Sequence, residues 1–91
     1  MDGISIILPC YKGEKVIAKT LERTAKTLEE LKRDYEIIVV VDGQLDASYE
    51  IALEASKQNP KIKAFAYEQN KGKGFALKHG AQFISKELTL F

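Results

Sequence analysis

The sequence contains one cysteine, one histidine, no tryptophan and no long apolar run. Because Cys10 is alone, an internal disulfide and a cysteine-rich zinc site are both excluded. His79 is the single histidine, which argues against a histidine metal centre. The longest apolar runs, such as residues 37–41, are far shorter than the roughly 20 residues that cross a bilayer. No basic segment with a cleavage site opens the chain, so we expect no signal peptide and a cytoplasmic protein.

Neither sign of charge dominates the chain. It has 14 Lys and Arg residues against 13 Asp and Glu residues, a net charge of +1. A generic nucleic-acid binder or a polybasic membrane peptide would show a clear basic excess, so we expect no nucleic-acid partner. Apolar residues make up 45% and charged residues 30% of the chain. This balance is ordinary for a folded protein, and residues 1–91 are expected to form a single domain.

Apolar, β-rich segments alternate with amphipathic helical patterns along the chain. Strands are expected at residues 4–8, 36–41, 62–67 and 88–91, and helices at residues 14–33, 47–58 and 73–85. Strands joined by helices form a parallel sheet with right-handed crossovers. The expected fold is therefore α/β and Rossmann-like, in the order β-α-β-α-β-α-β, with helices flanking the sheet.

Local signals indicate how these elements end and pack. Pro9 is expected to end the first strand because it has no N–H to donate, and Asp46 is expected to be the N-cap of the second helix. Gly80, inside the third helix, would allow that helix to approach the sheet closely. Apolar spacing predicts the buried faces of the first and third helices, at Ile17, Leu21, Ala25, Leu28 and Leu31 and at Leu77, Ala81 and Ile84.

Candidate binding residues follow the first three strands. Ligands of parallel sheets bind beyond the carboxyl ends of the strands, where these segments should converge. An aromatic ring there can stack on a base, and a carboxylate can accept hydrogen bonds from a base or a ribose. Lysines beside glycines at a helix start suit phosphate. The pattern predicts a nucleotide site formed by Pro9, Tyr11, Asp42, Asp46, Lys71 and Lys73.

Each of these residues also has a structural explanation. Asp42 could begin an Asx turn, Asp46 could serve only as a cap, and Tyr11 could pack at the domain boundary. The two lysines could be solvated loop charges. Cys10 is expected to be a small buried residue and not a nucleophile, because no histidine base accompanies it. His79 is expected to face solvent or to pack at the edge of the third helix.

The familiar nucleotide fingerprints are absent. A dinucleotide motif starting at Gly72 would need a third glycine where Leu77 stands, and it would follow the third strand rather than open the fold. A Walker loop would need Ser or Thr after Lys73, where the chain has Gly74. These two kinds of nucleotide site are therefore set aside.

Three segments resemble the first part of the inverting family 2 glycosyltransferases, which have the GT-A fold. They are I-S-I-I-L-P-C-Y at residues 4–11, E-I-I-V-V-V-D-G-Q-L-D at 36–46 and N-K-G-K-G-F-A-L-K-H-G at 70–80. Their order and spacing match across nearly the whole chain, and the likeness within the family is to dolichol-phosphate mannose synthase-like enzymes. By this resemblance Pro9 and Tyr11 would line the base and ribose pocket.

The same resemblance implies roles for the later candidates. Asp42 would bind the base edge of a sugar nucleotide, with Asp46 nearby, and Lys73 or Lys71 would approach the diphosphate. The family transfers a sugar from a nucleotide diphosphate to a hydroxyl or a lipid phosphate, and a divalent metal, Mg²⁺ or Mn²⁺, neutralises the leaving diphosphate. The implied partners are a sugar nucleotide and a saccharide or lipid-phosphate acceptor, the latter at a membrane face that a full-length form would approach.

The chain departs from the family pattern at several positions. Lys12 and Gly13 follow Tyr11 where the family has Tyr-Asn-Glu, and Val41 replaces the first residue of Asp-Asp-Gly-Ser-Thr-Asp. The Asp-x-Asp metal motif and the catalytic base would follow residue 91. We therefore expect no catalytic residue, no metal ligand and no sugar transfer by this chain alone. A non-catalytic Rossmann-like nucleotide-binding or interaction domain with a degenerate pocket remains the alternative.

The outer strands of a four-stranded sheet leave backbone N–H and C=O groups unpaired. Such edges can pair with a second copy of the chain. We therefore expect a homo-oligomer, formed through the fourth strand or an exchanged terminal element.

Overall fold

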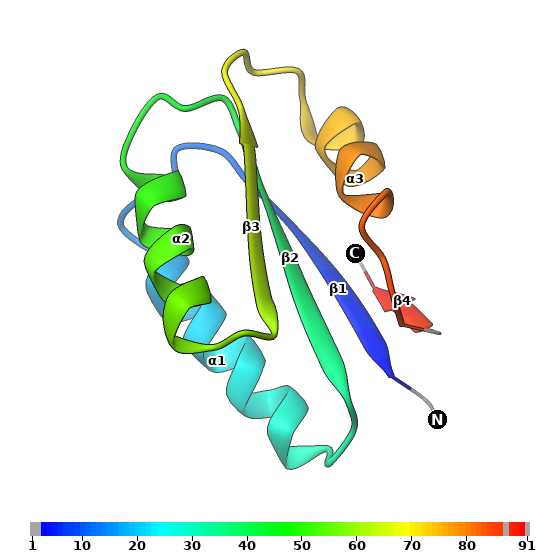
Figure 1. Ribbon diagram of the computed structural model, residues 1–91. Coiled ribbons are helices and arrows are strands. Elements are labelled where there is room, and N and C mark those ends of the chain that lie inside the picture. Colours follow the sequence, from blue (N-terminus) through cyan, green and yellow to red (C-terminus); the bar gives the residue numbers. More distant parts are fainter. Residues whose placement is uncertain (1–2, 87, 91) are drawn as a thin grey trace.

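Parallel strands and helices alternate along the chain in the computed structural model, which describes residues 3–86 and 88–90 (Figure 1). The strands are β1 (Ile4–Cys10), β2 (Tyr35–Asp42), β3 (Ile62–Tyr67) and β4 (Leu88–Leu90), and the helices are α1 (Ile17–Glu30), α2 (Ser48–Gln58) and α3 (Lys73–Ala81). The sheet has the order β3-β2-β1-β4 with parallel neighbours throughout. The predicted Rossmann-like α/β fold is confirmed. Residue 91, at the end of the fourth predicted strand, lies outside the described residues.

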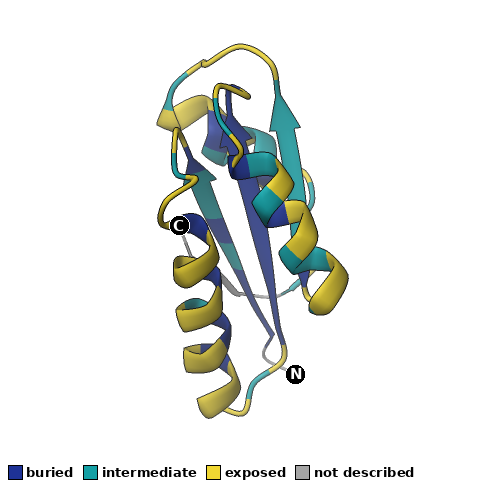
Figure 2. Cartoon of the chain, turned by 90° about the vertical axis from the view of Figure 1, so that its left-hand side faces the viewer, coloured by how far each residue is buried: buried dark blue, intermediate teal, exposed yellow. Residues whose placement is uncertain are grey.

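The sheet is covered on both faces, because alternate residues of β2 point to opposite sides. Ile37, Val39 and Val41 share an apolar core with α1 and α2, whereas Ile38 and Val40 share another with α3. Figure 1 shows the same layers, with α1 and α2 on one side of the sheet and α3 on the other. Figure 2 shows that the helices are buried mainly on the sides that face the sheet. The expectation of a strand covered on both faces is therefore confirmed.

The prediction that the first strand ends at Pro9 is wrong. β1 includes Pro9, which lies opposite Val40 of β2. The N–H of Ile4 points to the β2 side of β1 and donates to the Asp34 carbonyl at 2.9 Å. Successive residues of a strand direct their backbone groups to opposite sides, so the backbone nitrogen of Pro9, five residues later, points to the β4 side. Because the described part of β4 pairs with β1 only at Ile4–Ile6, the missing N–H of Pro9 costs no hydrogen bond there.

The first helix is shorter than the predicted range 14–33, although its apolar stripe is buried as far as Leu28. α1 ends at Glu30, and Lys32 adopts a left-handed φ of +56°, a common way to end a helix. Leu31 therefore falls outside the helical repeat and is 55% exposed, contrary to the prediction. Neither α1 nor any other helix in the described part of the chain is long and apolar enough to cross a bilayer.

α3 ends at Ala81, before its predicted end, and its buried residues are Ala76 and Gly80. An added Cβ at Gly80 would lie 2.8 Å from Ile7 Cγ2 and 3.0 Å from Val40 Cγ2, so the predicted close approach to the sheet is confirmed. Because Gly80 faces the sheet, the next residue turns outward, and the prediction of a buried Ala81 is wrong. The partly buried residues beside this core are Phe65, Tyr67, Leu77, Phe83 and Ile84.

Candidate functional site

A cavity of about 400 Å³ lies at the carboxyl ends of β1 and β2. Its lining residues are Ile7, Leu8, Pro9, Cys10, Tyr11, Asp42 and Lys73. Four of the predicted binding residues, Pro9, Tyr11, Asp42 and Lys73, thus meet at one cavity although they come from three distant parts of the sequence. The two others, Asp46 and Lys71, are not among the lining residues.

A larger groove, of about 610 Å³, lies between α1 and α2. Its lining includes the apolar residues Leu21, Ile51 and Ile62 and none of the predicted binding residues. We place the candidate site in the smaller cavity because an aromatic ring, a carboxylate and a cation meet there. It also lies at the carboxyl ends of β1 and β2, the edge of a parallel sheet where ligands bind.

The carboxylate of Asp42, a residue that is only 3% exposed, holds the loop that follows β3. Its Oδ2 accepts hydrogen bonds from Asn70 Nδ2 at 2.6 Å and from the Gly72 N–H at 2.9 Å. Its Oδ1 accepts one from the Lys71 N–H at 2.8 Å. A carboxylate offers about four acceptor positions, so one position on Oδ1 remains beyond these contacts. Asp42 is therefore a structural anchor as well as part of the cavity wall.

Tyr67 lies opposite Asp42 in the register of β2 and β3, and its buried hydroxyl has no hydrogen-bond partner of ordinary geometry among the described residues. Burial and the Asp42 carboxylate raise the pKa of this hydroxyl. Burial acts to raise the pKa of Asp42 as well, but the nearby Tyr67 hydroxyl and the N–H groups of Lys71 and Gly72 outweigh it and lower that pKa. Asp42 is therefore ionised at neutral pH, and the pair keeps unused hydrogen-bonding capacity.

The two candidate lysines differ in what they contact. Lys73 is the first residue of α3 and lines the cavity. The ammonium of Lys71 lies 5.3 Å from the centre of the Phe75 ring, a cation–π contact. The tertiary structure thus separates the two residues that the sequence left as alternatives, and Lys73 is the one at the cavity.

Tyr11 is 50% exposed at the edge of the cavity, so its ring is accessible for stacking. The ammonium of Lys12 lies 5.4 Å from the centre of that ring. Lys12 has a φ of +51°, in the left-handed region, and the chain turns there directly after β1. Cys10, just before this turn, is buried.

Asp46 joins the loop after β1 to the start of α2. Its Oδ1 accepts hydrogen bonds from the Ser48 N–H at 2.9 Å and the Ser48 hydroxyl at 2.5 Å, and its Oδ2 accepts one from the Glu14 N–H at 3.2 Å. The Ser48 hydroxyl is the main cause of the lowered pKa of Asp46. The prediction that Asp46 is the N-cap is wrong, because its turn onto Ser48 delays the helix by one residue and Ala47 becomes the N-cap.

Sequence reasoning did not single out Asn70 and Tyr67, which both adjoin Asp42. The register of parallel strands could have found Tyr67, because it ends β3 directly opposite Asp42. No local signal identifies the partner of Asn70, since the two side chains are 28 residues apart in the sequence. Contacts of this kind exist only once the strands are paired.

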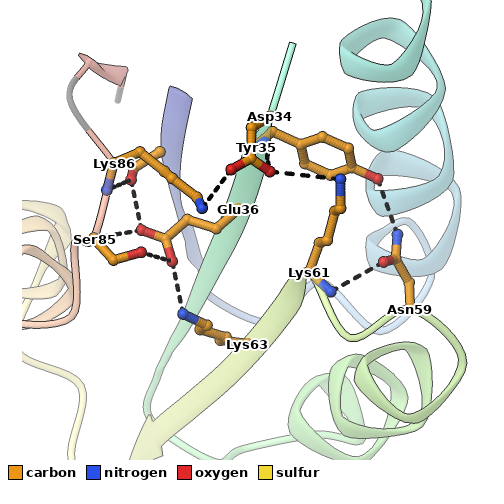
Figure 3. A network of polar contacts seen from close by, with 9 residues as sticks. Asp34, Tyr35, Glu36, Asn59, Lys61, Lys63, Ser85 and Lys86 are labelled. Atoms are coloured by element: carbon orange, nitrogen blue, oxygen red, sulfur yellow. Dashed lines mark hydrogen bonds and ion pairs between the residues drawn. The ribbon is translucent and has the colours of Figure 1, made fainter. Parts of the chain in front are cut away.

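A second buried carboxylate lies near the amino end of β2, at the opposite end of the strand from the cavity (Figure 3). Glu36 is 2% exposed, and its Oε1 accepts hydrogen bonds from Lys63 Nζ at 2.7 Å and Ser85 Oγ at 2.9 Å. Its Oε2 accepts hydrogen bonds from Ser5 Oγ and the Ser85 N–H, both at 2.6 Å. Burial opposes ionisation, but these donors outweigh it and lower the pKa of Glu36 to about 2. The network joins β1, β2 and β3 to the segment that leads into β4.

Within residues 3–86 and 88–90, no three or more His, Cys, Asp or Glu side chains lie together in a way that could hold a metal ion. Asp42 binds the loop at residues 70–72, whereas Asp46 binds Glu14 and Ser48, so the two aspartates serve different segments. The described residues therefore do not fit the divalent metal that the family resemblance implies.

The parallel sheet with helices on both faces and a cavity at its carboxyl edge defines a Rossmann-like α/β fold. The sequence pattern of glycosyl transferase family 2 matches residues 5–91. The chain belongs to this family, and the resemblance seen in its three motifs is confirmed.

Several curated glycosyltransferases are similar to the chain. It is 34% identical over 79 residues to the uncharacterized glycosyltransferase YkcC of Bacillus subtilis, covering 87% of this chain and 24% of the relative. The chain is 34% identical over 92 residues to a dolichyl-phosphate beta-glucosyltransferase of Trichomonas vaginalis, a match that covers 96% of this chain and 28% of the relative. The chain is 32% identical over 88 residues to an undecaprenyl-phosphate 4-deoxy-4-formamido-L-arabinose transferase of Photorhabdus laumondii, a match that covers 96% of this chain and 27% of the relative. The chain thus spans about a quarter of the length of these relatives.

Proposed function

We propose that the cavity binds the nucleoside diphosphate of a sugar nucleotide, and that the chain is the nucleotide-binding part of a glycosyltransferase. The convergence of Tyr11, Asp42 and Lys73 on one cavity carries this proposal. An aromatic ring, a carboxylate and a cation are suitable partners for a base, a ribose or base edge, and a phosphate. Membership of glycosyl transferase family 2 supports the same function.

Each lining residue takes one part of the ligand. The exposed ring of Tyr11 stacks on the base beside Pro9. Asp42 accepts a hydrogen bond from the base edge through the acceptor position that the loop leaves on Oδ1. Lys73 places a cation against the diphosphate, where a charge-assisted hydrogen bond is stronger than a neutral one.

Asp46 and Lys71 act on the ligand indirectly. Asp46 holds the loop that carries Tyr11 against the start of α2 through the Glu14 N–H. Lys71 contributes its backbone N–H to Asp42, while its ammonium remains on the Phe75 ring.

For the whole protein we propose transfer of the sugar to a lipid-phosphate or saccharide acceptor. The names of two relatives contain dolichyl-phosphate and undecaprenyl-phosphate, which supports the lipid-phosphate class of acceptor. Such an acceptor would bring a cytoplasmic protein to a membrane face. A divalent metal would neutralise the leaving diphosphate in this reaction, and its ligands would have to come from outside the described residues.

Titration with uridine and guanosine diphosphates, with and without Mn²⁺, tests the proposal by NMR. We expect one of the two to shift the signals of Tyr11 and Asp42. Lys73→Ala should weaken binding about 10-fold, the equivalent of ~1.4 kcal/mol, because it removes a charge-assisted contact. Lys71→Ala is the matched control, with a change below about 2-fold, because its ammonium lies on Phe75.

A flat titration with both diphosphates would overturn the proposal and favour an interaction domain with a degenerate pocket. The contacts of Asp42 to the loop at residues 70–72 lend some support to that alternative, because they already use most of its acceptor positions. Equal losses in the two lysine variants would contradict the placement of the diphosphate at Lys73.

A further inference from the structure

The loop after β3 is bound to a single carboxylate by three consecutive residues. Asn70 donates through its side-chain amide at 2.6 Å, Lys71 through its N–H at 2.8 Å and Gly72 through its N–H at 2.9 Å, all to Asp42. A charged acceptor makes each of these hydrogen bonds stronger than a neutral one. The position of the loop is therefore set by β2, to which Asp42 belongs.

The loop after β2 approaches the same loop closely at Gly43. Gly43, directly after Asp42, has a φ of +92°, and an added Cβ there would lie 3.1 Å from the Asn70 backbone nitrogen. The loops after β2 and β3 are thus packed against each other at the backbone as well as joined through Asp42. Asn70 is therefore held by a close backbone contact as well as by its hydrogen bond.

Lys73 follows this loop directly and lines the cavity. Its helix is fixed at the other end, where Gly80 lies against Ile7 and Val40. The place of the Lys73 side chain is therefore determined by two attachments of α3 to the sheet. The nearer one is the set of contacts that Asn70, Lys71 and Gly72 make with Asp42, and Asn70 is the residue of this set that uses its side chain. Asn70 itself is exposed and is not among the residues that line the cavity, so it can act on a ligand only through the loop.

We propose that Asn70 is a positioning residue of the cavity, which acts through the Asp42 carboxylate to hold Lys73 where a diphosphate binds. The choice of ligand rests on the function proposed above. The contact of Asn70 with Asp42 and the position of Lys73 are properties of the ligand-free protein.

Two variants test this role in the ligand-free protein. Asn70→Ala removes the 2.6 Å hydrogen bond, and Gln69→Ala changes the exposed preceding residue as a matched control. In Asn70→Ala, amide hydrogen exchange at Lys71 and Gly72 should become roughly 5-fold faster, which corresponds to a loss of about 1 kcal/mol. The NMR order parameter of Lys73 should fall. Gln69→Ala should change neither quantity. Unchanged exchange and order in Asn70→Ala would overturn the proposal.

Binding measurements show whether the position of Lys73 matters to the ligand. Asn70→Ala should lower the affinity for the diphosphate that the protein binds by roughly 5-fold. The affinity for the matching nucleoside, which has no phosphate, should be unchanged. In a Lys73→Ala background the same substitution should have almost no further effect, because the cation that the loop positions is gone. Additive losses in this double-mutant cycle, or an equal loss for the nucleoside, would overturn the positioning role.

Failure of the two proposals can be distinguished. A wild-type protein that binds neither diphosphate overturns the proposed function, and the hold of Asn70 on Lys73 is then decided by the exchange and order measurements. A wild-type protein that binds a diphosphate, with affinity unchanged in Asn70→Ala, keeps the proposed function and overturns the positioning role.

Discussion

Glu36 and Asp42 are both buried carboxylates of β2, but their hydrogen-bonding positions are filled to different extents. Glu36 accepts two hydrogen bonds at each oxygen, from Lys63, Ser5 and Ser85. Asp42 accepts three from the loop after β3 and forms part of a cavity wall. A carboxylate with every position filled can only hold the fold together, whereas one with a position left can also bind a ligand. The number of filled acceptor positions, and not burial, distinguishes the structural acid from the candidate functional one.

The largest effect is expected from Glu36→Ala, measured by urea unfolding. Removal of the carboxylate leaves Lys63, the buried Ser5 and the exposed Ser85 without their acceptor, which should cost about 3 kcal/mol of unfolding free energy. Because Glu36 lies at the far end of β2 from the cavity, nucleotide affinity below the unfolding transition should be unchanged.

Asp34→Asn provides the control for this prediction. The Asp34 carboxylate is exposed and pairs with Lys86 at 2.7 Å, so its loss should change stability little (Figure 3). A loss of nucleotide affinity in Glu36→Ala as large as that in Lys73→Ala would show that the two ends of β2 are not independent.

The next effect concerns the response of Glu36 to acid. The pKa of Glu36 is lowered from 4.5 to about 2 on folding, so its contribution to stability is complete above pH 4.5 and is lost as the pH falls toward 2. The shift corresponds to roughly 3 kcal/mol across this window. Glu36→Gln should be less stable at neutral pH and should lose less stability between pH 4.5 and 2, measured by urea unfolding at several pH values. If the unfolding free energies of the wild type and the variant fell in parallel with pH, Glu36 would not be the source of the acid sensitivity.

The smallest effect concerns the sheet edges. In the described part of the sheet, β3 and β4 are the outer strands, and the Glu36 network holds Lys63 of β3 inward. We predict weak self-association through these edges, visible by sedimentation velocity as a rise in mean mass with concentration. Glu36→Ala should increase self-association because loss of the network loosens β3. A strictly monomeric profile at high concentration in both proteins would contradict the prediction.

The parts of the fold that were predicted correctly depend on patterns within a few residues. The apolar run at residues 37–41 indicated a strand covered on both faces, and Gly80 indicated a close approach to the sheet. Parallel topology then placed Tyr11, Asp42 and Lys73 at one end of the sheet without any knowledge of side-chain positions.

The failures have a common physical cause. The position of Pro9 within β1 depends on which neighbour its backbone faces, and the exposure of Leu31 depends on the turn at Lys32. Asn70 reaches Asp42 across 28 residues, and Ser85 reaches Glu36 across 49. None of these relations leaves a trace in the local sequence.

Order of elements, parallel topology and family membership therefore follow from the amino-acid chain alone, because periodicity and the handedness of crossovers act over short distances. Tertiary structure decided which of two lysines reaches the cavity and which of two buried carboxylates keeps an acceptor position. These outcomes depend on the register between strands that are remote in the chain, since a hydrogen bond forms only when its two groups are brought to within about 3 Å.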